Sequence, residues 1–245
     1  MSLAGRSSNL VRIDGGGASA NPKEFRLESD AFWRIRLWED NGETNPTHNN
    51  EWWSVETSDG TVYRLGTSDD SVDWLPVWYP SGGCSEEYAL CDTARQWNLT
   101  TVTDTFGNEM VYQYNQEINF YNARGITTAF KLPYVRASQI ETITYGGNPT
   151  LNPPSPANAR IVLNWEQRCG QSSAFGDCNA VPTGFLDAPV DLWCNTHAAA
   201  DEYPVVCDEE APTFWSLVRF GGALSQVANG DELSLIHISE PTRPY

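Results

Sequence analysis

Hydrophobic and polar residues alternate with a period of two along the first third of the chain. Trp33, Ile35 and Leu37 alternate with two arginines, which is the pattern of a strand with one buried face. A second alternating run enters Asp59-Gly60, and a third run leaves it. An Asp-Gly dipeptide between two such runs predicts a β-hairpin, because a two-residue turn needs positive φ at both central positions.

A second hairpin is predicted over residues 97–114. Its turn carries Asp104, Gly107 and Asn108. An aspartate side chain bonds the backbone two residues further on, and the glycine supplies the left-handed residue of a bulged turn. The turn chemistry therefore predicts a hairpin with a bulge at its tip.

The outgoing strand of this hairpin is irregular, and further strands follow it. Leu99 and Val102 differ in parity, so either a bulge interrupts the strand or both of its faces are covered. Period-two and β-branched patterns predict three later strands, in residues 138–145, 160–168 and 214–227. A Pro-rich stretch after the first of them is predicted to be a surface loop.

Two segments show no regular period, namely 67–96 and 169–212, and we expect them to be irregular insertions. They hold all six cysteines in three neighbouring couples. The cysteines are Cys84, Cys91, Cys169, Cys178, Cys194 and Cys207. Local disulfides are favoured over zinc, because no Cys-x-x-Cys pair is present and His197 alone helps the metal reading. Disulfides would imply an extracytoplasmic location, secreted or on the cell surface.

Composition supports an all-β fold. The chain of 245 residues is 40% hydrophobic and 12% aromatic, enough to bury a core, yet it has only two lysines and two methionines. Good helix formers are scarce, whereas Trp, Tyr, Thr, Val, Gly and Asn are plentiful. We therefore predict antiparallel hairpins joined by tight turns.

The formal net charge of −17 excludes two classes of partner. Nucleic acids and anionic membranes both require a basic face, so we expect neither as a partner. No stretch approaches the roughly 20 apolar residues of a membrane-spanning helix. No basic and apolar signal segment follows Met1, which we expect to be an internal methionine of a longer protein.

The last thirteen residues differ in character from the rest. Residues 233–243 resemble the translation of a transposon-end adapter used in preparing sequencing libraries. We therefore expect 1–232 to be the native part, a fragment from a bacterial, metagenomic source, and 233–245 to be a non-native tail excluded from the fold. A natural amphipathic tail is the alternative, since its leucines and isoleucines alternate as in a short strand.

The succession of motifs resembles the RHS/YD-repeat toxin family, whose hairpins carry a Tyr-rich strand and an Asp-x-x-Gly turn. The matching segments are Ser58-Asp59-Gly60-Thr61-Val62-Tyr63, Asp104-Thr105-Phe106-Gly107-Asn108 with Tyr112 and Tyr114, Tyr134-Val135-Arg136-Ala137-Ser138 and Ile143-Thr144-Tyr145-Gly146. Their order is similar to the segment that precedes the regular repeats in SpvB-like and insecticidal toxin-complex B proteins.

This resemblance implies a fold and a partner. The family builds a hollow shell from a large twisted or spiralling β-sheet that encloses a C-terminal toxic polypeptide. The expected partners are the remainder of the same polypeptide and its toxin cargo, with no cofactor. Regular repeats, a self-cleavage motif and a toxin domain are not found in this sequence. The resemblance therefore implies a structural segment of the shell.

Catalysis and metal binding are not expected in this segment. The histidines before the tail, His48 and His197, have no catalytic motif around them, and no Gly-x-Ser-x-Gly elbow is present. Calcium is conceivable at the acidic run Asp69, Asp70 and Asp73, but the twelve-residue calcium loop is missing, so a solvated loop is favoured.

A surface adhesion or carbohydrate-binding module is the alternative function. Trp74, Trp78 and Tyr79 lie in the first irregular insertion, where exposed aromatic rings would offer a platform for a sugar. Most other tryptophans alternate within predicted strands and are more simply core residues. An exposed flat platform of these three residues would favour the binding module over the shell.

Overall fold

The computed structural model describes the chain in nine segments. They are residues 1–3, 5–16, 21–29, 32–39, 51–78, 90–121, 132–168, 211–229 and 232–239, with the backbone alone described for 78, 90, 229 and 232–239. The one helical piece in these segments is a 3-10 turn, η1 (Asp69–Ser71). No helix within them is long and apolar enough to cross a membrane. The prediction of an antiparallel all-β fold is confirmed.

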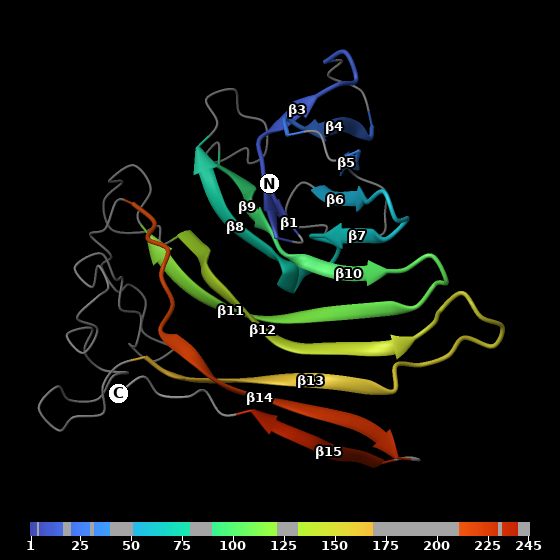
Figure 1. The fold of residues 1–245 in the computed structure, drawn as a ribbon. Helices are drawn as coiled ribbons and strands as arrows, with labels where there is room; N and C mark the ends of the chain where they lie inside the picture. The colour runs from blue at the N-terminus through green and yellow to red at the C-terminus, as the bar shows by residue number, and fades with distance from the viewer. Residues whose placement is uncertain are drawn as a thin grey trace, which may run out of the picture.

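Eleven strands form one open antiparallel sheet whose order follows the chain, apart from one inserted pair (Figure 1). They are β3 (Leu10–Arg12), β4 (Lys23–Leu27), β5 (Arg34–Glu39), β6 (Glu51–Glu56), β7 (Val62–Leu65), β10 (Leu99–Thr103), β11 (Glu109–Tyr121), β12 (Leu132–Gly147), β13 (Ala159–Gln167), β14 (Val218–Asn229) and β15 (Glu232–Ser239). Because neighbouring strands are antiparallel, every second connection lies at the same end of the sheet.

Two strand pairs lie outside the main sheet. β1 (Ser2–Leu3) pairs with β2 (Arg6–Ser7), and β8 (Val72–Trp78) pairs with β9 (Leu90–Trp97). The second pair corrects our expectation that 67–96 is irregular. Its strand pattern was concealed by acidic residues, by Pro76 inside β8 and by a register shift at Asp73–Trp74. The described parts of the insertion, 72–78 and 90–96, are therefore paired strands, whereas 79–89 lie outside the described residues; β8 packs against β12 of the main sheet.

The main core is built from one residue of each of four successive strands. Leu27, Ile35, Val55 and Leu65 are buried together. Met1 and Leu3 of the N-terminal hairpin pack against them, as do Phe25, Trp33, Trp53, Tyr63, Trp97, Leu99 and Leu10. The alternation seen in the sequence thus places one face of β4 to β7 against a covering layer.

The same face continues across the later strands as one cross-strand row. Val102 pairs with Tyr63 on one side and with Met110 on the other, and Met110 pairs with Tyr145. The predicted irregularity of β10 is confirmed as a bulge, because its register with β7 shifts between Leu99 and Thr101. Each bulge adds local twist to a large sheet of this kind.

The C-terminal segment forms an edge strand. β15 pairs with β14 from Asn229–Glu232 to Ala223–Ser239. Alternating apolar residues readily add to an exposed sheet edge through backbone hydrogen bonds, whatever their origin. The origin of residues 233–245 therefore stays a prediction, although residues 232–239 do form a strand. The second expected insertion, 169–212, lies outside the described residues except for its last two positions.

Candidate functional site

Two predicted turns adopt the same geometry at one end of the sheet. The Gly60 N–H donates to the Thr57 carbonyl at 2.9 Å, and the Gly107 N–H donates to the Asp104 carbonyl at 3.1 Å. Gly60 has φ +85° and Gly107 has φ +83°, whereas Asp59 has no positive φ. Both are turns closed by a single left-handed glycine. The two-residue turn expected at Asp59-Gly60 is corrected to this bulged form, because only one residue is left-handed.

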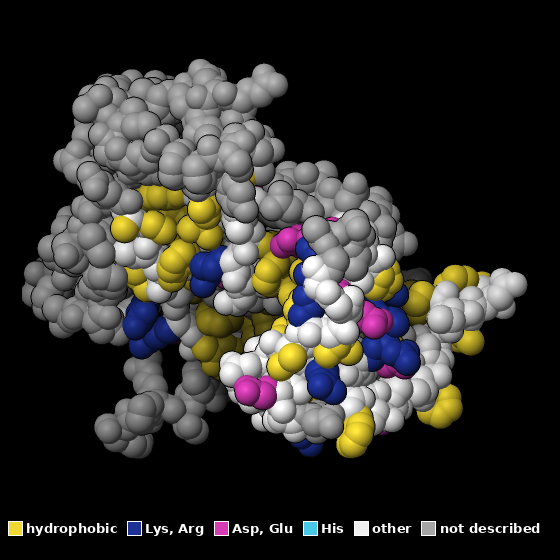
Figure 2. All heavy atoms as spheres, turned by 90° about the horizontal axis from the view of Figure 1, so that it is seen from above, with side chains coloured by type: hydrophobic (Ala, Val, Ile, Leu, Met, Phe, Trp, Pro, Cys, Tyr) yellow, Lys and Arg dark blue, Asp and Glu magenta, His cyan; other side chains and the backbone are white. Residues whose placement is uncertain are grey.

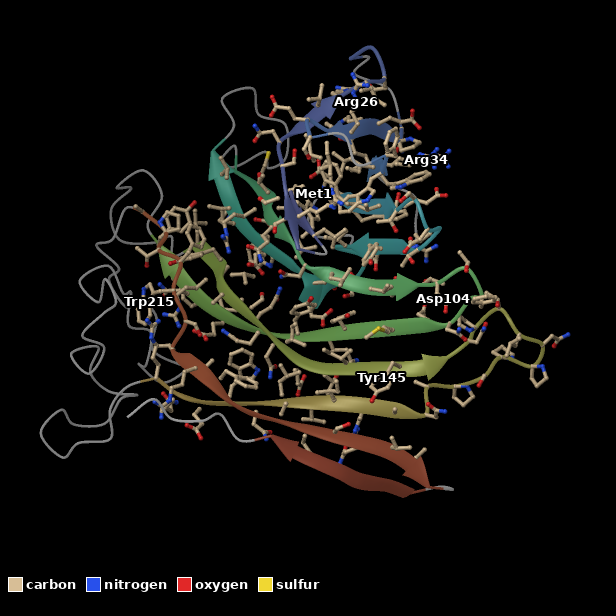
Figure 3. The ribbon with its side chains drawn as sticks, in the orientation of Figure 1. Met1, Arg26, Arg34, Asp104, Tyr145 and Trp215 are labelled. Carbon is tan, nitrogen blue, oxygen red and sulfur yellow. The ribbon has the colours of Figure 1, made fainter. Side chains whose placement is uncertain are left out.

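Aspartates brace both turns. The Thr57 hydroxyl donates to the Asp59 carboxylate at 2.6 Å, and this bond lowers the pKa of Asp59. The Asn108 side-chain amide donates to Asp104 at 2.7 Å and lowers the pKa of Asp104, while the Phe106 N–H donates to the same carboxylate at 2.8 Å. The predicted turn aspartates thus act as turn braces, and Figure 3 shows Asp104 at the end of the sheet opposite Trp215.

The neighbouring hairpin tips contact one another. A Cβ atom placed on Gly60 would lie 2.5 Å from Cγ2 of Thr105, in the next turn. Asn148, on the following hairpin, donates its side-chain amide to the Phe106 carbonyl at 2.9 Å. The tips thus form a continuous row that holds the strand ends in register. Glycine at position 60 is required by both its backbone angle and the lack of space.

A buried carboxylate attaches the β8–β9 hairpin to the main sheet. Asp73 on β8 is 2% exposed and accepts a hydrogen bond from Arg95 at 2.8 Å. It also accepts bonds from Asn98 at 3.1 Å and from the Ser138 hydroxyl on β12. We expected Asp73 to lie in a solvated loop, and this expectation was wrong, because the residue is buried in a strand. Its charge is compensated by an arginine and by hydrogen bonds from three segments, which is the condition for burying a carboxylate.

A second carboxylate, whose side chain is 14% exposed, fastens the segment that leads into β14. Glu117 on β11 accepts bonds from Arg136 at 2.8 Å and from Gln139 at 2.6 Å, both on β12. It also accepts bonds from the Ser216 hydroxyl at 2.6 Å and the Leu217 N–H at 2.9 Å. All of its strong acceptor positions are engaged. Sequence reasoning did not find this network, although an arginine inside an apolar run such as 134–137 signals a buried partner.

The predicted disulfides fall mostly outside the described residues. Cys91 on β9 is 4% exposed and is bonded in a disulfide. Cys84, Cys169, Cys178, Cys194 and Cys207 lie outside the described residues, so the pairing and the pinning of the long loops stay predictions. Across the described segments no cluster of three or more His, Cys, Asp or Glu side chains could hold a metal ion.

The predicted glycan platform is described only in part. Trp74 lies within strand β8, opposite Ala94, and is half-buried rather than on an irregular loop. The backbone of Trp78 continues the strand, while its side chain and the whole of Tyr79 lie outside the described residues. A flat platform formed by these three side chains therefore stays a prediction.

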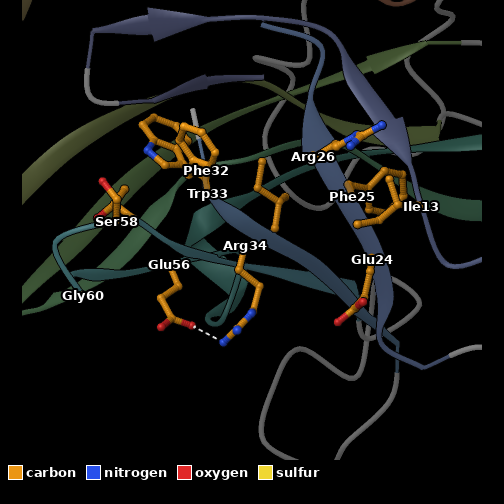
Figure 4. Close-up of a pocket in the computed structure, with 12 residues that line it drawn as sticks. Ile13, Glu24, Phe25, Arg26, Phe32, Trp33, Arg34, Glu56, Ser58 and Gly60 are labelled. Carbon is orange, nitrogen blue, oxygen red and sulfur yellow. Dashed lines mark hydrogen bonds and ion pairs between the residues drawn. The ribbon is translucent and has the colours of Figure 1, made fainter. Parts of the chain in front are cut away.

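A shallow groove of about 500 Å³ lies where β4 and β5 separate, and sequence reasoning did not anticipate it. Phe25 and Ile13 line one side of it, and Phe32 and Trp33 line the other (Figure 4). Seen from above, this N-terminal part of the molecule carries hydrophobic, acidic and basic side chains next to one another (Figure 2). The volume lies in the range of ligand-binding pockets, roughly 300–1,000 Å³.

Comparisons with known proteins find similarity in structure alone. No protein-family model and no curated protein matches the chain. The N-terminal domain of the effector protein SpvB from Salmonella typhimurium strain LT2 matches with a TM-score of 0.50 and 12% identity, over 94% of this chain and 71% of that chain. A chain of the TcdB2-TccC3-TEV crystal structure matches with a TM-score of 0.45 and 15% identity, over 87% of this chain.

The match to the SpvB N-terminal domain shows a related fold. This chain covers only 10% of the TcdB2-TccC3-TEV chain, and both identities are too low to carry over an activity. Membership of the RHS/YD-repeat family is not shown by any of the comparisons. The all-β sheet of this chain is thus similar in fold to the SpvB N-terminal domain, a domain of a bacterial effector protein.

Proposed function

We propose that this chain is a structural wall segment of a large secreted or surface toxin of the RHS/YD-repeat type. In the full protein its sheet would continue and help to enclose a C-terminal toxic domain. The observation that carries the proposal is the strand order: eleven antiparallel strands follow one another along the chain in an open sheet. Such a sheet extends by adding strands at its edges.

The covering layers support the same role. The β1–β2 hairpin packs on the N-terminal strands, and the β8–β9 hairpin packs against β12. Between these coverings, every residue of β10 except the buried Thr100 is half-buried, as are residues 109–112 of β11. A sheet that is partly covered and open at its edges is suited to forming a wall against further polypeptide.

Disulfides are a finer part of this proposal. We propose that cysteine couples pin the long segments of the wall in an extracytoplasmic compartment, as the bonded state of Cys91 supports. Non-reducing digestion followed by mass spectrometry would identify the partner of Cys91. Six free thiols after purification under oxidising conditions would contradict the pinning.

The decisive experiment uses the uninterrupted gene from the source DNA. We expect reading beyond codon 232 to continue into Tyr-Asp repeats and a variable C-terminal domain. Electron cryomicroscopy of the product should show a hollow particle whose wall contains β3 to β14 in chain order, with the C-terminal domain protected from added protease. A gene that stops within a few codons, or a protease-sensitive C-terminal domain outside a solid particle, would contradict the wall.

A further inference from the structure

The chain that leads into β14 crosses the ends of β11 and β12 as a short strap, residues 212–217 (Figure 1). None of the strap residues belongs to a strand of the sheet. One backbone hydrogen bond, from the Arg168 N–H to the Leu217 carbonyl at 2.8 Å, joins the strap to the chain that follows β13. Side chains from β9, β11 and β12 supply further contacts along the strap.

The first half of the strap is bound through its main chain and one ring. The Tyr134 hydroxyl on β12 donates to the Thr213 carbonyl at 2.9 Å and accepts a bond from the Thr213 N–H at 2.8 Å. The Arg95 guanidinium on β9 lies 4.0 Å from the centre of the Phe214 ring. A guanidinium over an aromatic face is attracted by the ring electrons. The sheet thus contacts Thr213 through its backbone and Phe214 through its ring.

The second half of the strap is bound through a ring, a hydroxyl and a main-chain donor. The Arg136 guanidinium on β12 lies 4.5 Å from the centre of the Trp215 ring. The Ser216 hydroxyl and the Leu217 N–H both donate to the Glu117 carboxylate on β11, at 2.6 Å and 2.9 Å. Hydrogen bonds to an ionised carboxylate are stronger than neutral ones. Each strap residue from 213 to 217 therefore has a partner of its own on the sheet.

The sheet positions the receiving side chains without help from the strap. Each of three receiving side chains is held by a residue of β8 or β11. The pairs are Tyr134 with Asn119 at 3.0 Å, Arg136 with Glu117 at 2.8 Å, and Arg95 with Asp73 at 2.8 Å. A binding surface that is already ordered loses little conformational freedom when a peptide binds to it.

The contacts of the strap can break while the sheet stays intact. The strap has no strand ladder, and Phe214 is 42% exposed in its docked position. Segments held in this way open locally, at a lower free energy than paired strands. Opening would leave the receiving side chains in place, because their partners lie within the sheet.

We propose that Arg95, Glu117, Tyr134 and Arg136 form a peptide-binding site, and that the strap is its autoinhibitory occupant. When the strap opens, the site takes an extended segment of a partner protein that carries two adjacent aromatic residues followed by a residue with a hydroxyl group. The two guanidinium groups select the aromatic rings, and the carboxylate selects the hydroxyl and the next N–H. This inference does not depend on the proposed wall function.

The first test measures peptide binding to the whole chain by fluorescence anisotropy. The probe is a fluorescein-labelled hexapeptide with the strap sequence Pro-Thr-Phe-Trp-Ser-Leu. A tethered strap competes at an effective concentration in the millimolar range, so the parent chain should bind the probe weakly. Phe214→Ala removes one cation–π contact from the strap and none from the site. We expect this variant to bind the probe about tenfold more tightly than the parent chain, because the strap then occupies the site less.

A matched variant and a matched peptide accompany this test. Phe220→Ala removes a ring of similar exposure, 44%, from β14, where it packs against Trp165, and it should bind as the parent chain does. A hexapeptide with leucine in place of both aromatic residues should bind Phe214→Ala about tenfold more weakly than the probe. Equal binding of the two peptides, or binding by Phe214→Ala no tighter than by the parent chain, would overturn the proposal.

The second test follows opening of the strap itself by hydrogen exchange. In the parent chain the amides of 213–217 should exchange faster than the ladder amides of β11 and β12. Tyr134→Phe removes the hydroxyl that binds Thr213, and we expect it to raise the exchange rate of the strap about tenfold. Tyr121→Phe is the control, because its hydroxyl donates to the Pro76 carbonyl and its ring packs on Tyr134. Strap amides that exchange no faster than the ladder amides, or equal acceleration by both variants, would overturn the autoinhibitory role.

Discussion

The Glu117 carboxylate lies 2.8 Å from the Arg136 guanidinium, and the Arg136 side chain is only 1% exposed. Arg136 also lies over the Trp215 ring, 4.5 Å from its centre. The segment before β14 reaches the same carboxylate through Ser216 and Leu217, about a hundred residues further along the chain. One carboxylate thus joins β11, β12 and the approach to β14.

We predict that Glu117→Gln destabilises the protein by about 3 kcal/mol, because breaking a buried ion pair leaves Arg136 charged and uncompensated. Urea unfolding would measure the loss. Glu166→Gln is the matched control: its partner is Arg219, both side chains are more than half exposed, and its cost should stay below about 1 kcal/mol. Similar losses of unfolding free energy in the two variants would show that the Glu117 network stabilises the protein no more than an exposed ion pair does.

Asp73→Ala should release the β8–β9 hairpin from β12. The variant leaves Arg95 and Ser138 without the buried carboxylate, and we expect a loss of about 2–4 kcal/mol. Hydrogen exchange would report it as faster exchange in β8 and β9 than in β4 to β6. Asp69→Ala, at an exposed position of η1, serves as control, and comparable exchange in both variants would contradict the assignment.

Gly60→Ala tests the contact between hairpin tips. The left-handed backbone costs about 1–2 kcal/mol for alanine, and overpacking against Thr105 adds about 1–3 kcal/mol. Gly16 has a similar φ of +76° with no atom within 4 Å of the added Cβ, so Gly16→Ala should lose only the stability that the left-handed backbone costs. The double variant Gly60→Ala/Thr105→Ser should recover the overpacking share in thermal unfolding. No recovery would show that the tips are not in contact.

Acid should weaken the start of the sheet through Asp14. The Arg12 side chain donates to this carboxylate at 2.6 Å and lowers the pKa of Asp14 from 3.8 to about 2. Because the pKa of Asp14 is lower in the folded state, the contribution of this carboxylate to the free energy of unfolding is complete above pH 3.8. It is lost as the pH falls toward about 2. Asp14→Asn should therefore lose less stability over that window than the parent chain. An NMR titration showing an ordinary pKa for Asp14 would contradict this.

Local patterns predicted the hairpins well, since each depends on residues that are close in sequence. The turns at Gly60 and Gly107 and the irregularity near Leu99 follow from turn chemistry and from a period of two. The predicted two-residue turn at Asp59-Gly60 was wrong, because an Asp-Gly dipeptide suits two turn types and the local sequence does not decide between them.

Features that depend on distant contacts could not be predicted in the same way. Strand β8 was not predicted because aspartate and proline are unfavourable in strands. Here contacts from elsewhere in the chain offset this: Arg95 and Ser138 donate hydrogen bonds to Asp73. Tyr121 donates one to the Pro76 carbonyl. The groove was missed because it results from a ladder that stops early. Only the lone Arg136 in an apolar run could have indicated one of the buried networks.

The strand order also has a kinetic consequence. Each strand of the main sheet pairs with the strand that precedes it in the chain, except that β7 pairs with β10 only after the β8–β9 hairpin has been synthesised. Short sequence separation between partners makes loop closure cheap and folding fast. The sheet can therefore grow from the N-terminus while the chain is still emerging from a ribosome, and the contact between Glu117 and Leu217 closes late in that order.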